Sequence, residues 1–259
     1  MCLIAFSYRQ SEKYPLVLIA NRDESYARAS RAAAFWEGEA GILGGRDLEK
    51  GGTWLGINKH GRFAAVTNYR DGLVEKSSSR SRGLLVSEYL QQTGCVEDYL
   101  QHSIDSADQY GDFNLLLGDT RSVYFLNSRE AEYRELSKGS YALSNGHLDS
   151  NWPKMKRARE EIDGRVQGQQ ALEHEALLDV LSDRRIARDE DLPNTNVGLE
   201  LERKLSPIFI AGENYGTRVS TVLTIDSSHE VLLSERSYNS EAEIDGECHY
   251  RFLIEGGKQ

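Results

Sequence analysis

The order of apolar runs along the chain is the feature that most limits its fold. Strand-length runs come in neighbouring pairs, and stretches with helical spacing form separate blocks between them. The resulting order is strands, helices, strands, helices, strands, which differs from the alternation that builds a parallel doubly wound sheet. We therefore expect antiparallel sheets covered by helices. No internal repeat or linker interrupts the sequence, which favours a single domain over residues 1–259.

Paired apolar runs with turn residues between them predict antiparallel strand pairs. The runs are 2–8 with 16–20, 53–58 with 62–67, 113–119 with 122–128, and 218–226 with 230–236. Shorter strands are expected at 141–145 and 250–254. Helical spacing predicts helices over 83–92, 96–104, 153–166 and 170–182. Residues 183–217 have little periodicity and are expected to form a long irregular segment.

Composition and charge exclude several classes of protein. Hydrophobic residues make up 39% of the chain, which is typical of a globular protein. The net charge of −10 argues against binding to nucleic acid or anionic lipid, because both need basic patches. No signal peptide and no apolar stretch of about 20 residues is found, so no integral membrane segment is expected. Cys2, Cys95 and Cys248 form no CxxC motif, which predicts a reduced, cytoplasmic protein with free thiols.

Cys2 is the first candidate for chemistry. Methionine aminopeptidases remove Met1 when the second residue is small, and removal would leave a thiol and a free α-amine on one residue. The reference pKa of the amine is about 7.7–8 and that of the thiol about 8.5. The amine can therefore act as the base for its own side chain. Alternatively, Cys2 is only a small apolar residue that opens a buried strand.

Polar residues 21–24 follow directly on the strand predicted at 16–20. The first hairpin would bring them back beside Cys2. There, Arg22 would lower the pKa of the thiol, and a carboxylate would hold the amine or the arginine in position. An ordinary solvated turn is the alternative interpretation.

Three further polar residues lie at the ends of predicted strands. Asn68 and Asn145 could donate hydrogen bonds to an oxyanion without adding a charge, although turn asparagines are common at such positions. Arg218 opens the last long strand, where a surface salt bridge is the simpler explanation. His147 and Asp149 have no second ligand pair at a recognisable spacing, so no metal site is expected.

These groups occur together, in a fixed order, as recognisable motifs. The motifs are MCLI at 1–4, ANRDE at 20–24, GGTWLG at 51–56, AVTNYR at 65–70, LSNG at 143–146, SPIFI at 206–210 and YGTR at 215–218. They resemble the NRDE family, which is the transport and Golgi organization protein 2 family. The resemblance extends from residue 1 to about residue 235.

That family is distantly similar to the cysteine N-terminal-nucleophile (Ntn) hydrolases, among them penicillin V acylase, bile salt hydrolase and acid ceramidase. The resemblance implies an α+β fold, an αββα sandwich of two stacked antiparallel sheets between helix layers. Cys2 matches the nucleophile. Those enzymes have an Arg and an Asp on the second strand at a different spacing, and their nearest counterparts are Arg22 and Asp23, with Glu24 as an alternative. The remaining implied catalytic residues are Asn68, Asn145 and Arg218, and the candidate substrate-binding residues are Asn21, Glu24, Trp54 and Tyr69.

The function that the resemblance implies is hydrolysis of a C–N amide or acyl (thio)ester bond in a small or lipid-like substrate, without a cofactor. The alternative is a non-catalytic protein that binds or moves lipid, acyl-CoA or haem in the same cleft, since animal members are linked to lipid homeostasis and haem movement. An interaction or trafficking factor without a small ligand is a third interpretation. The sequence does not determine the oligomeric state.

Overall fold

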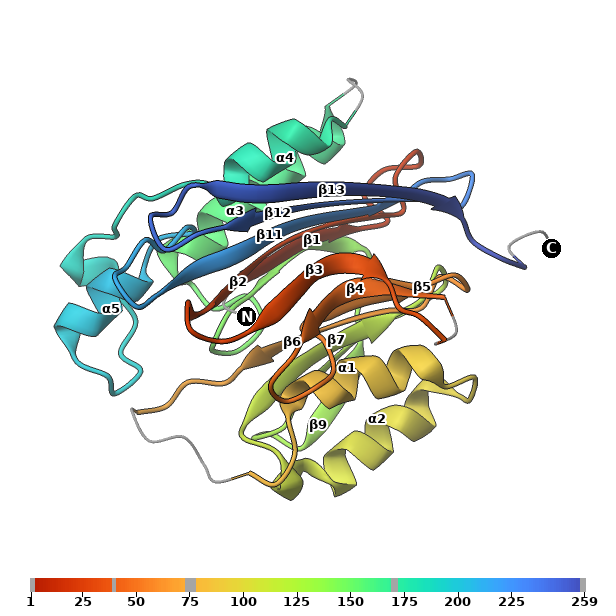
Figure 1. Cartoon of the computed structure of the whole chain (residues 1–259), viewed down its shortest axis with the longest axis horizontal. Helices are drawn as coiled ribbons and strands as arrows, with labels where there is room; N and C mark the ends of the chain where they lie inside the picture. The colour runs from red at the N-terminus through yellow and green to blue at the C-terminus, as the bar shows by residue number, and fades with distance from the viewer. Residues whose placement is uncertain (1–2, 39–40, 73–77, 169–171, 257–259) are drawn as a thin grey trace. The chain divides into compact units, whose positions relative to one another are not determined.

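The computed structural model describes residues 3–38, 41–72, 78–168 and 172–256 (Figure 1). The chain divides into two compact units whose segments alternate along the sequence. The first unit comprises Met1–Ala27, Arg70–Val74 and Lys138–Arg251, and the second comprises Arg28–Tyr69, Glu75–Ser137 and Phe252–Gln259. The expectation of a single domain stays a prediction.

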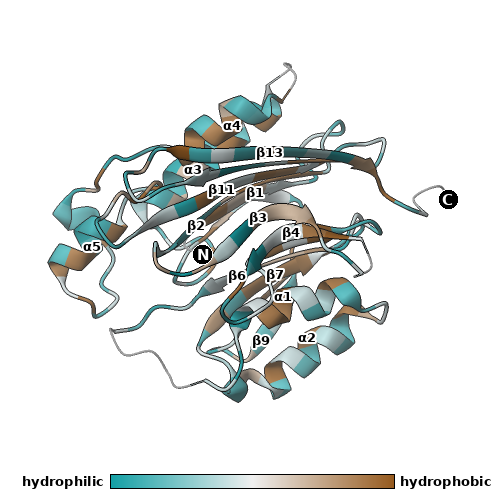
Figure 2. Ribbon diagram, viewed as in Figure 1, coloured by the Kyte–Doolittle hydropathy of each residue, from teal (hydrophilic) through white to brown (hydrophobic). Residues whose placement is uncertain are grey.

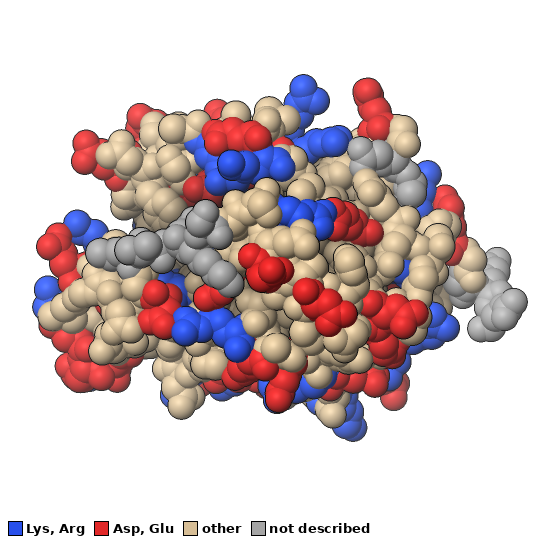
Figure 3. All heavy atoms as spheres, turned by 90° about the horizontal axis from the view of Figure 1, so that it is seen from below, with Lys and Arg blue, Asp and Glu red and all other residues tan. Residues whose placement is uncertain are grey.

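Side-chain types are sorted between the sheets and the surface. Figure 2 shows most of the strongly hydrophobic colour on the strands and on one side of the helices. On the face seen in Figure 3, acidic and basic side chains are interspersed. No helix of the described residues is long and apolar enough to cross a membrane.

The first unit is built on a six-stranded sheet with the order β10-β1-β2-β11-β12-β13. Neighbouring strands from β10 to β12 pair antiparallel. The strands are β1 (Leu3–Tyr8), β2 (Leu16–Ser25), β10 (Gly139–Leu143), β11 (Tyr215–Ile225), β12 (Glu230–Tyr238) and β13 (Ile244–Leu253).

Two helices, α3 (Pro153–Gln167) and α4 (His174–Leu181), cover one face of this sheet (Figure 1). Pro153 occupies the first turn of α3, where its missing N–H costs nothing. The apolar residues of α3 recur at helical spacing and pack against Leu3 and Ala5 of β1 in one buried cluster. A short helix, α5 (Leu199–Leu205), lies in the segment between α4 and β11.

The second unit is built on a seven-stranded antiparallel sheet in sequence order, β3 to β9. Helices α1 (Arg82–Gln91) and α2 (Val96–Asp105) pack on it. The strands are β3 (Ser30–Phe35), β4 (Ile42–Asp47), β5 (Leu55–Asn58), β6 (Phe63–Asn68), β7 (Phe113–Gly118), β8 (Val123–Asn127) and β9 (Glu132–Glu135).

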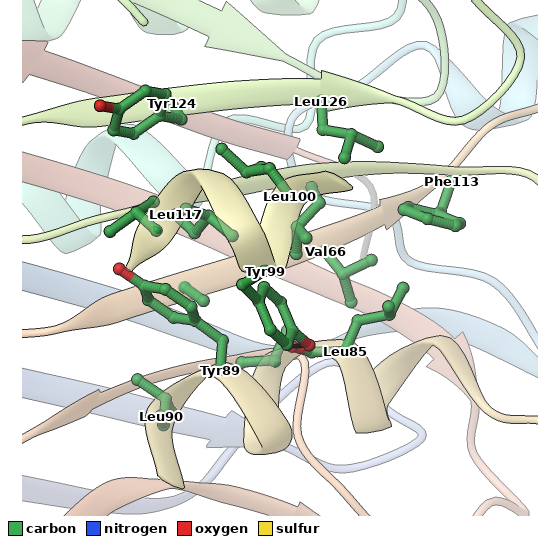
Figure 4. Close-up of a cluster of buried hydrophobic side chains, with 14 of the residues drawn as sticks. Val66, Leu85, Tyr89, Leu90, Tyr99, Leu100, Phe113, Leu117, Tyr124 and Leu126 are labelled. Atoms are coloured by element: carbon green, nitrogen blue, oxygen red, sulfur yellow. Dashed lines mark hydrogen bonds between the residues drawn. The ribbon is translucent and has the colours of Figure 1, made fainter. Parts of the chain in front are cut away.

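Figure 4 shows the core of the second unit, in which Tyr89 and Tyr99 lie among leucines from both helices and the sheet. Both tyrosine hydroxyls have backbone partners, since Tyr89 donates to the carbonyl of Gly118 at 3.2 Å and Tyr99 to that of Leu85 at 2.6 Å. Burial raises the pKa of both tyrosines. These residues therefore complete the core without leaving a buried hydroxyl unsatisfied.

The paired strands and the helices expected at 83–92, 96–104 and 153–166 are confirmed. Other elements differ from expectation. Strand β2 continues through residues 21–24 to Ser25, where a turn was one of the interpretations. The segment 183–217 contains α5 and the start of β11, and β13 is longer than the strand expected at 250–254. Strands β3, β4 and β9 were not predicted.

Candidate functional site

The candidate site lies at one end of the six-stranded sheet, where three neighbouring strands meet. Leu3, the first described residue of β1, pairs with Asn21 of β2. Across the other edge of β2, Asn21 pairs with Ser220 and Asp23 with Thr217 of β11. The beginnings of β1 and β11 and the polar half of β2 are therefore adjacent.

Arg22 is the most unusual residue of this group. Side chains alternate along a strand, and Val17 and Ile19 pack into the cluster beneath α3 and α4. Arg22 and Glu24 therefore belong to the opposite face. Arg22 is only 4% exposed, and its Nη2 lies 4.0 Å from Oε2 of Glu24. Burying a guanidinium in a sheet is costly unless it is paired, so this position carries a charge for a reason other than core packing.

Asp23 is buried as well, and β11 holds its carboxylate. The hydroxyl of Thr217 donates to Oδ1 of Asp23 at 2.6 Å. The same hydroxyl oxygen accepts from the backbone N–H of Ile210 at 2.9 Å. The hydroxyl of Tyr215 donates to the backbone carbonyl of Asp23 at 3.3 Å. The carboxylate therefore has a fixed orientation within the sheet.

Arg218 lies beside the same ladder at an irregularity between Thr217 and Val219. Its Nη1 donates to the backbone carbonyls of Ser25 at 3.0 Å and Tyr26 at 3.2 Å, and its guanidinium lies 5.8 Å from the centre of the Tyr26 ring. These contacts join the start of β11 to the chain that leaves β2. A surface salt bridge was the simpler explanation for Arg218, but the structure places this residue half-buried.

Asn21 has a structural role in this geometry. It is fully buried, and its Nδ2 donates to the carbonyls of Leu181 at 2.9 Å and Ile208 at 2.8 Å. Its Oδ1 accepts from the hydroxyl of Ser220 at 2.6 Å. The amide thereby ties α4 and the loop before β11 to the sheet. Its expected contact with substrate stays a prediction.

Asn145 follows β10 at the same end of the sheet and is part of a network that the sequence did not indicate. Its backbone carbonyl accepts from the N–H of Arg70 at 2.8 Å. The Arg70 side chain donates to Glu202 at 3.0 Å and to the hydroxyl of Thr195 at 2.8 Å, and it lies 5.3 Å from the ring centre of Trp152. In the sequence, Arg70 stood out only as the last residue of the AVTNYR motif. No sequence feature connected Arg70 with α5.

Asn68, Trp54 and Tyr69 belong to the second unit. Asn68 ends β6 and pairs with Phe113. Trp54 is buried against Gly45, where an added Cβ would lie 2.2 Å from its ring. The guanidinium of Arg129 lies 5.1 Å from the centre of the Tyr69 ring. The expected roles of these three residues in the site stay predictions.

Cys2, the predicted nucleophile, lies outside the described residues. Its expected proximity to Arg22, Asp23, Asn145 and Arg218 stays a prediction. The two described cysteines are thiols that take no part in a disulfide. Cys95 is exposed, whereas burial and the nearby Glu235 carboxylate raise the pKa of the Cys248 thiol to about 11. Cys248 is therefore protonated at neutral pH and a poor nucleophile.

Metal-ligating residues are scattered in this structure. Within residues 3–38, 41–72, 78–168 and 172–256, no three His, Cys, Asp or Glu side chains gather in a way that could hold a metal ion.

Comparison with solved structures gives the fold first. The crystal structure of the mutant C2A conjugated bile acid hydrolase from Clostridium perfringens matches with a TM-score of 0.52 at 9% identity, covering 96% of this chain and 92% of that one. The chain therefore has an Ntn-hydrolase-like α+β fold.

Sequence comparison then gives the family. The family model described as Transport and Golgi organisation 2 matches residues 1–240. The chain is 32% identical to the Transport and Golgi organization 2 homolog of Mus musculus, covering 92% of this chain and 93% of that protein. It is 33% identical to the Bos taurus homolog with the same coverage of both chains. The chain belongs to the transport and Golgi organisation 2 family.

Proposed function

We propose that this protein is an N-terminal cysteine hydrolase that cleaves a C–N amide or an acyl (thio)ester bond of a small or lipid-like substrate. The observation that carries the proposal is the burial of Arg22 and Asp23 in β2, next to the strand that Leu3 begins. Buried charges of both signs at a strand end have a cost, and active sites are where proteins commonly accept it.

The chemistry requires only groups at this end of the sheet. After removal of Met1, the α-amine of Cys2 takes the thiol proton, and the thiolate attacks the substrate carbonyl carbon. Arg22 favours the thiolate electrostatically, because a nearby guanidinium lowers the pKa of a thiol. Asp23, oriented by Thr217, holds the ammonium, while Glu24, on the same face as Arg22, pairs with the guanidinium.

The tetrahedral intermediate then collapses. The side-chain amide of Asn145, which follows β10 at this end of the sheet, stabilises its oxyanion. The C–N bond breaks, and the proton on the α-amine passes to the leaving nitrogen. Water next attacks the acyl thioester, which releases the acid and restores the thiol. No cofactor takes part in either half of the reaction, and a reduced thiol fits the expected cytoplasmic location.

The structural relative supports this proposal. That protein is a conjugated bile acid hydrolase, solved as its C2A mutant. A substrate that joins an apolar body to a polar group through an acyl bond is the class we propose for this chain.

Hydrolysis of a substrate panel tests the proposal. Purified protein is incubated with acyl amides and acyl thioesters of graded chain length, and the released acid is measured by mass spectrometry. We expect turnover of at least one of these classes, abolished in Cys2→Ala. Asn145→Ala should retain binding but lose about 10²–10³ in rate if its amide donates to the oxyanion. Equal release by wild type and Cys2→Ala would refute the hydrolase.

The second candidate function is a non-catalytic carrier of lipid, acyl-CoA or haem. The names of the sequence relatives refer to transport and Golgi organization and specify no reaction. The Cys2→Ala variant separates the two functions. Tight binding of acyl-CoA or haem that is the same in wild type and Cys2→Ala, with no acid released from any substrate, would establish the carrier instead.

A further inference from the structure

Strand β13 forms one edge of the six-stranded sheet. It pairs with β12 on one side, and no strand of the described residues pairs with its other side. It is 10 residues long, whereas strands usually have about 5–6. A long edge presents a row of backbone N–H and C=O groups that can pair with another chain.

The side chains of this edge strand are polar rather than apolar. Figure 2 shows β13 mostly in the hydrophilic colour. The alternate residues Asp245, Glu247, His249 and Arg251 are all exposed. They share one face of the strand because side chains alternate with a period of two. A partner must therefore match charges, and it need not cover an apolar surface.

The order of these charges is self-complementary. In an antiparallel pair of two identical strands, residues at equal distances from a two-fold axis lie opposite each other. With Cys248 opposite Cys248, Asp245 lies opposite Arg251 and Glu247 opposite His249. The axis generates each of these pairs twice. Opposite charges placed across an antiparallel pair are favourable, and like charges are unfavourable.

Neighbouring registers fit less well. With residue 247 on the axis, two copies of Glu247 face each other, and with residue 249 on the axis, two copies of His249 do. A slip by one residue places the charged faces of the two strands on opposite sides of the sheet. Only the register centred on Cys248 places both acidic side chains, Asp245 and Glu247, opposite a basic one.

Contacts within the chain leave these side chains available. The guanidinium of Arg251 is 69% exposed and lies 3.7 Å from Oε2 of Glu230, so it has room to bind a second carboxylate. Nδ1 of His249 is 2.9 Å from the hydroxyl of Ser234, although the ring is 63% exposed. Arg236 contacts Glu247 at 3.0 Å and thereby holds this side chain on the face that the partner would meet.

We propose that two copies of this chain pair antiparallel through β13, with Cys248 opposite Cys248, and so join their six-stranded sheets into one. The proposal is independent of the hydrolase chemistry, because its residues lie at the far edge of the sheet from β1 and β10.

Charge reversal tests the pairing. Sedimentation equilibrium over a concentration series gives the dimer dissociation constant of the full chain. Arg251→Asp places like charges opposite each other twice, and we expect it to weaken the dimer at least about tenfold. The double variant Asp245→Arg with Arg251→Asp restores the pairs and should return the constant to near the wild-type value. Arg121→Asp, at a side chain that is 87% exposed in the second unit, is the matched control.

Two results would overturn the proposal. One is a wild-type chain that remains monomeric at every concentration. The other is a dimer whose constant is the same in wild type, Arg251→Asp and the double variant. Circular dichroism of each variant establishes that it is folded before its association is measured.

Oxidative cross-linking tests the register separately. Cα atoms of directly opposed residues in an antiparallel pair are about 4.5–5.5 Å apart, which is within the range that a disulfide can bridge. In Cys2→Ala with Cys95→Ser, copper phenanthroline should produce a covalent dimer through Cys248. Adding Arg251→Asp should reduce its yield in proportion to the weaker association. Failure to cross-link a variant that sediments as a dimer would exclude this register.

Discussion

The carboxylate of Asp23 accepts a 2.6 Å hydrogen bond from the hydroxyl of Thr217, the residue directly opposite it on β11. The hydroxyl also accepts from the N–H of Ile210, so one oxygen satisfies both a buried carboxylate and a backbone donor. This bond joins two segments 194 residues apart in the sequence.

Replacing Thr217 by Val removes both interactions while keeping the shape of the side chain. We expect a loss of about 1–3 kcal/mol in the free energy of unfolding, because buried polar groups lose their partner. Thr217→Ser retains the hydroxyl and should lose less. Urea denaturation measures both. A Thr217→Val variant as stable as wild type would show that the bond contributes nothing to orienting Asp23.

The ion pair of Arg70 and Glu202 gives a second prediction. Their side chains are 14% and 4% exposed. Arg70→Met leaves the carboxylate buried beside Thr195, and removing one partner of a buried pair typically costs about 3–5 kcal/mol. Lys204→Met breaks the exposed pair with Glu200 and is the control, for which no measurable change is expected. Equal losses of unfolding free energy in Arg70→Met and Lys204→Met would contradict the claim that burial makes the first ion pair the more stabilising one.

His174 should make stability depend on pH. Burial, together with the nearby His249, lowers its pKa to about 4, whereas the unfolded-state value is about 6.5. Between these values the unfolded chain binds more protons, so stability rises with pH and is lost as the pH falls from 6.5 towards 4. The full effect is about 3 kcal/mol, since one pKa unit corresponds to about 1.4 kcal/mol.

A variant that cannot titrate isolates this effect. His174→Gln should reduce the difference in unfolding free energy between pH 6.5 and pH 4.5. His102→Gln, at an exposed position, should keep the wild-type dependence of unfolding free energy on pH. Denaturant unfolding at four or five pH values measures both slopes. The account of His174 would be wrong if its variant kept the full wild-type dependence on pH.

Local signals in the sequence predicted the strands that build the candidate site. Alternating apolar residues and turn residues mark β1 and β2, and the pairing of Leu3 with Asn21 follows from their hairpin. The continuation of β2 to Ser25 could not be predicted in this way. The polar residues 21–24 read locally as a turn, yet their backbone pairs with β11, which comes almost 200 residues later.

Elements without local signals were missed. Strand β4 contains Gly44 and Gly45, and glycine is unusual in strands. Both are required by close packing, since an added Cβ at Gly44 would lie 2.8 Å from the carbonyl oxygen of Leu55. The contact between Arg70 and Glu202 spans 132 residues, and no periodicity or motif spacing reports a contact of that range.

The central claim is that Cys2 becomes an activated N-terminal thiol beside Arg22. Its most direct test is peptide mapping by mass spectrometry after brief alkylation with iodoacetamide at pH 7. We predict that Met1 is absent and that Cys2 is alkylated faster than Cys95, with Cys248 slowest because its pKa is raised to about 11. Arg22→Met should slow Cys2 about tenfold, the effect of one pKa unit, and Arg121→Met should not. Retention of Met1, or alkylation of Cys2 no faster than that of Cys95, would contradict the account.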